Sequence, residues 1–434
     1  MAAGPAVPTG AAADLTPRTT SGAGLSGRRQ AALTAAMALS MGAGPLSLYA
    51  VTALSPLIAG ELGLTTGRLG TLAAVMYGTA AVTSLGTGRL VDTWSSRRVL
   101  AVLFGASLMA LAAVSAAPGY GVLLAAIVLC GAVQSASNPV TNKLIALHVP
   151  AGRRGTIVGV KQSGIQMTQL FAGAVLPPAA LLLGWRWAVA LGLPLIVAGW
   201  VLSTRAVPTG RTVHSAAASV SARAQTPVAL WQLASYTFCN AALVAAVNVH
   251  VPLYAFREVG LAAALAGATS GLIGGLGIVA RISWGRGAER RPTIRGPLLL
   301  LAALSLVATL LLQAAAAGGP LLLLGGLLLF AASAVPGQAV AMLALVSSTD
   351  RRRTGTTTGL MMLALYCGFM TGPLTFGLLV EASGSYGSGW LLLLAVAATS
   401  TVVLAHPLRR QAPGPRPHAA WAVERSGRDA DHGS

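Results

Sequence analysis

The chain has 434 residues, of which 55% are hydrophobic and only 9% are charged, yet its formal net charge is +19. Apolar stretches of about 18 residues or more, the length that crosses a bilayer as a helix, recur along the whole chain. This pattern excludes a soluble globular protein, whose helices would carry charged faces, and predicts a multi-pass membrane protein.

Twelve membrane-spanning helices are predicted when the apolar runs are taken in chain order. We expect the first six to form one bundle at 30–205 and the last six a second bundle at 229–406, joined by a cytoplasmic loop at 206–228. Residues 1–29 and 407–434 are predicted as disordered cytoplasmic tails. The approximate spans are 31–59, 67–88, 98–117, 120–148, 156–183, 187–205, 229–256, 262–284, 296–316, 320–347, 355–380 and 389–406.

Basic residues gather on one side of this arrangement. If the N-terminus is cytoplasmic, the inner loops, including those at 89–98 and 281–295, and the two tails hold all but five of the 29 Lys and Arg residues. The positive-inside rule then predicts an even number of spans, with both termini in the cytoplasm and the protein in the plasma or inner membrane.

Clustered Arg is also typical of nucleic-acid binding, but these clusters are short and separated by bilayer-length helices. We therefore expect no nucleic-acid partner. The chain has no Walker-type loop, no metal-ligand spacing and no paired catalytic groups within the spans, so we predict no enzyme, no cofactor and no metal site. We expect a monomer whose partners are the lipid bilayer and a small-molecule substrate, and a coupling ion such as a proton stays an open alternative.

The two halves repeat each other. Gly88 and Gly285 each stand four residues before an acid at a span end, and Glu61 and Glu258 each follow the outer end of a span. Both pairs have the same shift of 197 residues, from 88 to 285 and from 61 to 258. Duplicated six-helix halves are typical of secondary transporters.

The segment Gly88-Arg-Leu-Val-Asp92-Thr-Trp-Ser-Ser-Arg97-Arg98 resembles the G-x-x-x-D-[RK]-x-G-x-[RK]-[RK] signature of the major facilitator superfamily. Thr93 and Ser95 replace the usual basic residue and the usual glycine. The resemblance covers about residues 31–406. It implies an all-α integral membrane protein with twelve transmembrane helices in two pseudo-symmetric six-helix bundles.

The resemblance also implies that this loop controls the conformation. Gly88 would allow close helix approach, Asp92 would form a charge pair or a helix cap, and Arg97 and Arg98 would be its cytoplasmic partners. The two arginines equally fit a plain topology signal. A weaker match to the same motif occurs in the second half. It implies the same gating role for Gly285, Glu289 and Arg290.

Polar side chains inside the spans mark candidate substrate-binding positions, because they are costly in lipid and usually face a cavity or another helix. Here they recur at helical spacing on single faces of spans that line the central cavity in the resembled family. The same amides would also join helices by hydrogen bonds of about 0.6 kcal/mol each. The candidates are Gln134, Asn138 and Asn142 in the fourth span, Gln162, Gln166 and Gln169 in the fifth, and Tyr236, Asn240 and Asn248 in the seventh.

Lys143 and Lys161 lie within predicted spans, each about 10 Å from the inner membrane surface. All ten acidic residues stand in tails, loops or span ends, so neither lysine has a counter-ion at its depth. An anionic ligand would supply the missing charge, and both lysines are therefore candidate substrate-binding residues. Snorkelling of the long side chains to the interface explains the same placement.

These observations predict a secondary active or facilitative transporter that moves a small, anionic or polar organic solute by alternating access. The alternative is a multidrug-type efflux carrier for amphipathic compounds, which the low polar content of the eighth, ninth and eleventh spans favours. A membrane receptor or scaffold that does not transport is a third reading.

Overall fold

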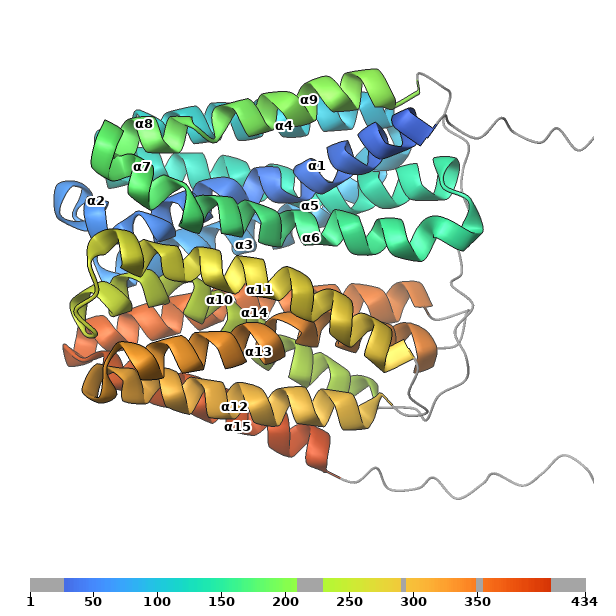
Figure 1. Cartoon of the computed structure of the whole chain (residues 1–434). Helices are drawn as coiled ribbons and strands as arrows, with labels where there is room; N and C mark the ends of the chain where they lie inside the picture. Colours follow the sequence, from blue (N-terminus) through green and yellow to red (C-terminus); the bar gives the residue numbers. More distant parts are fainter. Residues whose placement is uncertain (1–26, 209–228, 290–293, 349–353, 407–434) are drawn as a thin grey trace, which may run out of the picture.

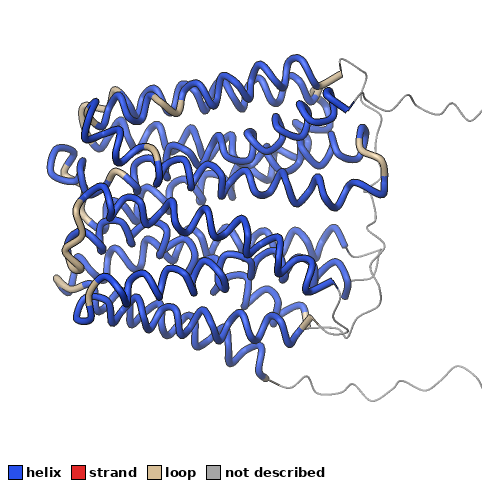
Figure 2. The backbone as a smooth tube through the Cα atoms, viewed as in Figure 1, coloured by secondary structure: helices blue, strands red, loops and turns tan. Residues whose placement is uncertain are grey.

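The computed structural model describes residues 27–208, 229–289, 294–348 and 354–406. These residues form α-helices, one short 3-10 helix and connecting turns, without a strand (Figure 2). Twelve helical stretches among them are long and apolar enough to cross a membrane, which confirms the predicted number of spans. The predicted tails and most of the connecting loop at 206–228 lie outside the described residues.

The first half contains six spans built from nine α-helices, because three predicted spans are divided into two helices each. Every division is followed by a helix with proline in its first turn, where the missing N–H costs no helical hydrogen bond. The helices are α1 (Gly27–Ala53), α2 (Ser55–Leu62), α3 (Thr66–Thr93), α4 (Ser96–Ser115), α5 (Tyr120–His148), η1 (Ala151–Arg153), α6 (Arg154–Ala174), α7 (Leu176–Leu183), α8 (Trp185–Ala190) and α9 (Leu193–Ala206).

The second half is six undivided helices. One boundary differs from the prediction in a way that matters for the site: the eighth span runs to Glu289, beyond the predicted end at 284, so the part of the predicted basic loop from Arg281 to Glu289 is helical. The helices are α10 (Leu230–Arg257), α11 (Ala263–Glu289), α12 (Arg295–Gly318), α13 (Pro320–Ser348), α14 (Thr354–Ser383) and α15 (Tyr386–Ala405).

The two halves lie side by side with their helices roughly parallel (Figure 1). The start of α1 and the end of α15 lie on the same side of the molecule, which we call the terminal face. The opposite side, with the turns at Gly63 and Gly260, is the loop face. One large apolar core belongs to the first half and two smaller ones to the second.

Small residues bring the halves into backbone contact on the side of the loop face. Gly173 of α6 packs directly on Gly271 of α11, and Gly70 of α3 packs on Pro373 of α14. A Cβ atom added to Gly274 would lie 2.6 Å from the backbone nitrogen of Leu170. Such close approach of helix backbones needs glycine and supplies most of the van der Waals attraction between helices in a membrane.

The halves separate toward the terminal face. Figure 1 shows α6 and α11 diverging in this direction. Glycines near this end of the helices have open space where a Cβ atom would be, with no atom within 4 Å: Gly86, Gly88, Gly155, Gly159, Gly285, Gly287 and Gly359. The close glycine contacts between the halves therefore lie on the side of the loop face, and α6 and α11 diverge toward the terminal face.

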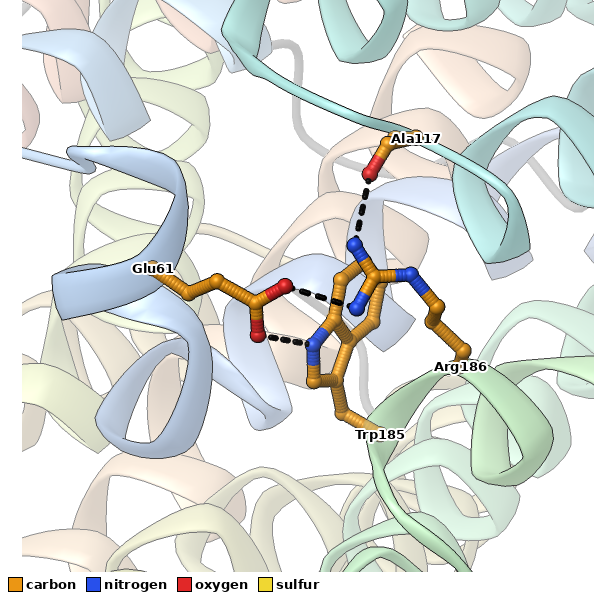
Figure 3. Close-up of polar contacts among 4 residues, drawn as sticks. All are labelled: Glu61, Ala117, Trp185 and Arg186. Carbon is orange, nitrogen blue, oxygen red and sulfur yellow. Dashed lines mark hydrogen bonds and ion pairs between the residues drawn. The ribbon is translucent and has the colours of Figure 1, made fainter.

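A polar clamp ties the loop face of the first half together (Figure 3). The Glu61 carboxylate accepts hydrogen bonds from Trp185 Nε1 at 2.7 Å and from Arg186 Nη1 at 2.6 Å. Arg186 also donates to the carbonyl oxygen of Ala117 at 3.2 Å and lies over the Trp185 ring. The clamp joins α2, α8 and the turn after α4.

The clamp predicts a pH dependence of folding stability. Hydrogen bonds from Trp185 and Arg186 lower the pKa of the Glu61 carboxyl below its ordinary value. This carboxylate therefore stabilises the folded state above the unfolded pKa of about 4.3, and the contribution is lost as the pH falls through the lower folded pKa. Thermal unfolding of detergent-purified protein should show a smaller loss of stability at acid pH for Glu61→Gln than for wild type. Glu258→Gln, at the repeat-equivalent exposed position, is the control and should behave like wild type.

The glycine contacts predict that adjacent positions respond differently to alanine. In Gly274→Ala the new Cβ would lie 2.6 Å from Leu170 N and 2.8 Å from Gln166 O, so the backbones of α6 and α11 must move apart. In Gly275→Ala it would meet only a Leu170 methyl group at 3.4 Å. Because both variants gain the same helix propensity, the difference isolates the contact. We expect Gly274→Ala to be less stable by about 1–3 kcal/mol in thermal unfolding. Equal stability of the two variants would contradict the backbone contact.

Candidate functional site

One face of α6 carries a line of polar side chains that runs along the boundary between the two halves. Its members are the adjacent residues Lys161 and Gln162, followed by Gln166 and Gln169 at intervals of about one helical turn. Lys161 and Gln162 contact α5, whereas Gln166 and Gln169 contact helices of the other half. We call this line the α6 polar face.

Lys161 is fully buried and is held by oxygen atoms of α5. Its Nζ donates to Asn142 Oδ1 at 2.6 Å, to Thr141 Oγ1 at 2.9 Å and to Asn138 Oδ1 at 3.4 Å. An ammonium group has three N–H donors, so these neutral oxygens match its capacity. The side chain is directed across to α5 and does not snorkel to the membrane surface. No carboxylate of the described residues lies within ion-pair distance of it.

Lys143 has a different environment from Lys161, although the sequence places the two at similar depth. Its Nζ donates to the carbonyl oxygens of Val91 at 2.5 Å and Trp94 at 3.3 Å, at the C-terminal end of α3. A cation at a helix C-terminus satisfies free carbonyl groups and interacts favourably with the helix dipole. In this structure Lys143 therefore caps α3 and shares no contact with Lys161, and its role in ligand binding stays a prediction.

The middle of the α6 polar face contacts Arg281 of α11, which belongs to the other half. With the Gln166 amide oriented so that both of its polar atoms are satisfied, its oxygen accepts from Arg281 Nη2 at 3.2 Å and its nitrogen donates to Gln162 O at 3.1 Å. Arg281 Nη2 also lies 3.4 Å from the carbonyl oxygen of Val335 in α13. The Gln162 side chain itself donates to Asn138 Oδ1 at 3.2 Å.

Sequence reasoning did not name Arg281 as a candidate, because it counted this residue with the basic loop at 281–295, although the predicted eighth span at 262–284 contains it. The repeat contained the signal that would have found it. A shift of 197 residues maps Arg281 onto Ser84, which lies inside the predicted second span at 67–88. The same shift maps Glu289 onto Asp92, and both are helical.

A second polar contact joins the halves nearer the loop face. Gln169 Nε2 donates to Asn248 Oδ1 of α10 at 2.9 Å, and both side chains are buried. The structure thus brings Asn138, Asn142, Gln162, Gln166, Gln169 and Asn248 into one connected region around α6.

The remaining polar candidates lie elsewhere, within a single half. Gln134 packs against Gly44 of α1, and Asn240 donates to the Ala334 carbonyl oxygen at 3.2 Å. The Tyr236 hydroxyl is closely packed against Gly337. The Asn240 bond joins α10 to α13, as expected for amides that connect helices, whereas the buried Tyr236 hydroxyl has no hydrogen-bond partner among the described residues.

The predicted gating residues are separated from partners in this conformation. Asp92 is exposed, and no described residue forms an ion pair with it. Arg97 is exposed, and Arg98 lies over the Trp94 ring at 4.7 Å. Ser95, which stands where the signature has glycine, caps α4 by accepting from Arg98 N at 3.3 Å.

The corresponding residues of the second half give less information. Gly285 has open space where a Cβ atom would be. Glu289 is the last residue of α11, and its side chain is not among those described. Arg290 lies outside the described residues.

Comparison with known proteins identifies the family. Residues 31–366 match the family model described as Major Facilitator Superfamily. A protein of Streptomyces lividans named chloramphenicol resistance protein is 29% identical over 274 residues, which is 59% of this chain and 67% of that protein.

Solved transporters share the fold at low sequence identity. A D-xylose-proton symporter has a TM-score of 0.69 at 13% identity, covering 87% of this chain and 97% of its own. The nucleoside transporter NupG has a TM-score of 0.68 at 12% identity, covering 87% and 99%. A bacterial homologue of the human lysosomal transporter Spinster has a TM-score of 0.63 at 14% identity, covering 86% and 94%.

The family model matches well over half of the chain, and the twelve spans in two halves have the architecture of solved transporters of the same fold. The protein belongs to the Major Facilitator Superfamily.

Proposed function

We propose that the protein is a monomeric carrier, not an enzyme, that moves a small anionic or polar organic solute across the plasma or inner membrane. Both termini are cytoplasmic in this proposal, so the terminal face is the inner face. The observation that carries it is the polar contact across the two halves, in which α6 meets Arg281 and Asn248. A solute that binds there touches both halves.

Alternating access is supported by the unequal contact along the boundary between the halves. Glycine backbones of the two halves meet on the side of the loop face, and α6 and α11 diverge toward the terminal face. The α6 polar face lies between these two regions. A solute from the terminal face would therefore reach it without disturbing the closed contact, and rocking of the halves would move the opening to the other side.

The charge of this region favours an anionic solute. Lys161 and Arg281 both lie deep among the helices, and the described residues place no carboxylate within ion-pair distance of either. Neutral oxygens alone hold these cations. Because a buried charge is costly when only dipoles surround it, a solute that brings a negative charge gains binding energy that a neutral solute does not.

A multidrug-type efflux carrier is the second candidate function. The relative named chloramphenicol resistance protein favours it, since that name describes protection from an organic antibiotic. A receptor or scaffold that does not transport is a third candidate. Measurements of solute flux distinguish these two candidates from the proposed carrier of anionic or polar solutes.

The direct test is solute flux in liposomes that contain the purified protein. A panel of organic anions, neutral sugars and amphipathic drugs should first be tested by thermal shift, and the stabilising compounds then measured for uptake and exchange. The proposal expects anions to stabilise the protein and to exchange across the membrane. Binding without flux would support a receptor, and flux restricted to neutral amphipathic compounds would support the efflux alternative.

We expect replacement by methionine to reduce solute exchange at one of the two lysines and not at the other. Lys161→Met removes positive charge from the α6 polar face and leaves Asn142 Oδ1 and Thr141 Oγ1 without their donor. We expect exchange of the anionic solute to fall by about tenfold or more.

Lys143→Met is the matched control. It removes the cap of α3 and should lower thermal stability by about 0.5–1.5 kcal/mol, while solute exchange per folded molecule stays close to wild type. Equal transport by wild type and Lys161→Met would show that Lys161 is only a structural link between α5 and α6.

A further inference from the structure

Glu381 stands at the unfavourable end of its own helix. It lies in the last turn of α14, which ends at Ser383 and has no basic residue in that turn. The free carbonyl groups of a helix C-terminus carry partial negative charge, so a carboxylate there is repelled. Glu381 is exposed, and no cation of the described residues forms an ion pair with it.

The Glu381 carboxylate lies against the first turn of α3, which belongs to the other half. Gly67, the second residue of α3, has no room for a Cβ atom, because that atom would collide with Glu381 Oε2. The N–H groups of a first helical turn have no helical acceptor and carry partial positive charge. The carboxylate thus lies at the negative end of its own helix and at the positive end of a helix from the other half.

Two further contacts hold the same turn of α3 against the second half. A Cβ atom added to Gly377, one turn before Glu381, would lie 2.5 Å from the carbonyl oxygen of Thr66. The Thr66 hydroxyl lies 3.4 Å from the Tyr386 hydroxyl, and both residues are buried. The packing of α3 on α14 therefore fixes the position of Glu381 over Gly67.

The symmetry-related boundary, where α6 and α7 meet α11, lacks this acid. A shift of 200 residues, which relates Gly159 to Gly359, makes Leu181 the counterpart of Glu381. Leu181 is apolar and 62% exposed. The charged contact therefore belongs to one of the two boundaries between the halves.

We propose that Glu381 is a latch that holds the two halves together on the loop face through the N-terminus of α3. This inference rests on the proposed function, in which the halves rock, and adds the residue that opposes their separation on this side. When α3 and α14 move apart, the carboxylate keeps the carbonyl end of α14 and loses the N–H end of α3. Its charge therefore favours the conformation described here, and loss of the contact should make the halves separate more often on the loop face.

Separation of the halves on the loop face can be followed at Ser270 of α11. Ser270 is buried, its hydroxyl has no hydrogen-bond partner among the described residues, and it lies beside the contact between Gly173 and Gly271. Ser270→Cys therefore removes no described hydrogen bond and places a thiol where separation of α6 and α11 admits water. Cys130, buried in the core of the first half, reports unfolding in the same protein.

The test measures how fast a water-soluble maleimide modifies these two thiols in the full-length Ser270→Cys protein, purified in detergent, by peptide mass spectrometry. The measured quantity is the ratio of the rate at Ser270→Cys to the rate at Cys130. Glu381→Gln should raise this ratio about two- to fivefold, the range for loss of one contact between a charge and a helix end. Gly67→Ala keeps the charge but displaces the carboxylate, and should raise the ratio by a similar factor. The two changes together should raise it no further, because both remove the same contact.

Two more variants separate the contact from the charge alone. Glu381→Asp keeps the charge at the end of α14 but is one methylene shorter, so it should also raise the ratio. Glu258→Gln removes another exposed acid of the loop face and should leave the ratio at the wild-type value. A wild-type ratio in either Glu381 variant or in Gly67→Ala would overturn the latch, as would an equal rise in Glu258→Gln.

Failure of this inference is distinguishable from failure of the proposed function, because the modification rates need no solute. Solute flux in liposomes together with unchanged ratios would overturn the latch and leave the carrier intact. The expected ratios without flux of any tested solute would support the latch and contradict the carrier.

Discussion

The backbone contact between α6 and α11 is the interaction on which the rest of the arrangement depends. Because Gly173, Gly271 and Gly274 allow the two helices to touch, the side chains that flank the contact come within hydrogen-bond distance across the halves. Gln166 then reaches Arg281. Further along, Gln169 reaches Asn248. A larger residue at the contact would move the partners of each pair apart and would disrupt the region assigned to the solute.

Positive charge within the bilayer is the second constraint. The membrane interior offers no water to a cation, so each buried cation must find oxygen atoms from the protein or from a ligand. Lys161 and Lys143 are held by side-chain and backbone oxygens of neighbouring helices. Arg281 is held less completely, with a buried Nε that has no partner. Arg281 is therefore the least satisfied of these three cations by its own chain.

The number of spans, the two halves and the polar face of α6 could all be predicted from sequence, because each follows from periodicity and from the length of a bilayer-crossing helix. The role of Lys143 could not, since capping of α3 depends on how α5 packs beside it. Arg281 was misplaced because a single Arg beside a basic loop looks like part of that loop. The repeat, which aligns it with Ser84 inside a span, and the predicted eighth span at 262–284 both place it within a helix.

The clamp around Glu61 has no counterpart around Glu258, which is exposed and forms no ion pair among the described residues, although the two acids stand at equivalent repeat positions. The two bundles therefore have the same topology but are held differently at the loop face. During a transport cycle we expect the braced bundle to act as the stationary frame, while the unbraced one bends and carries most of the displacement.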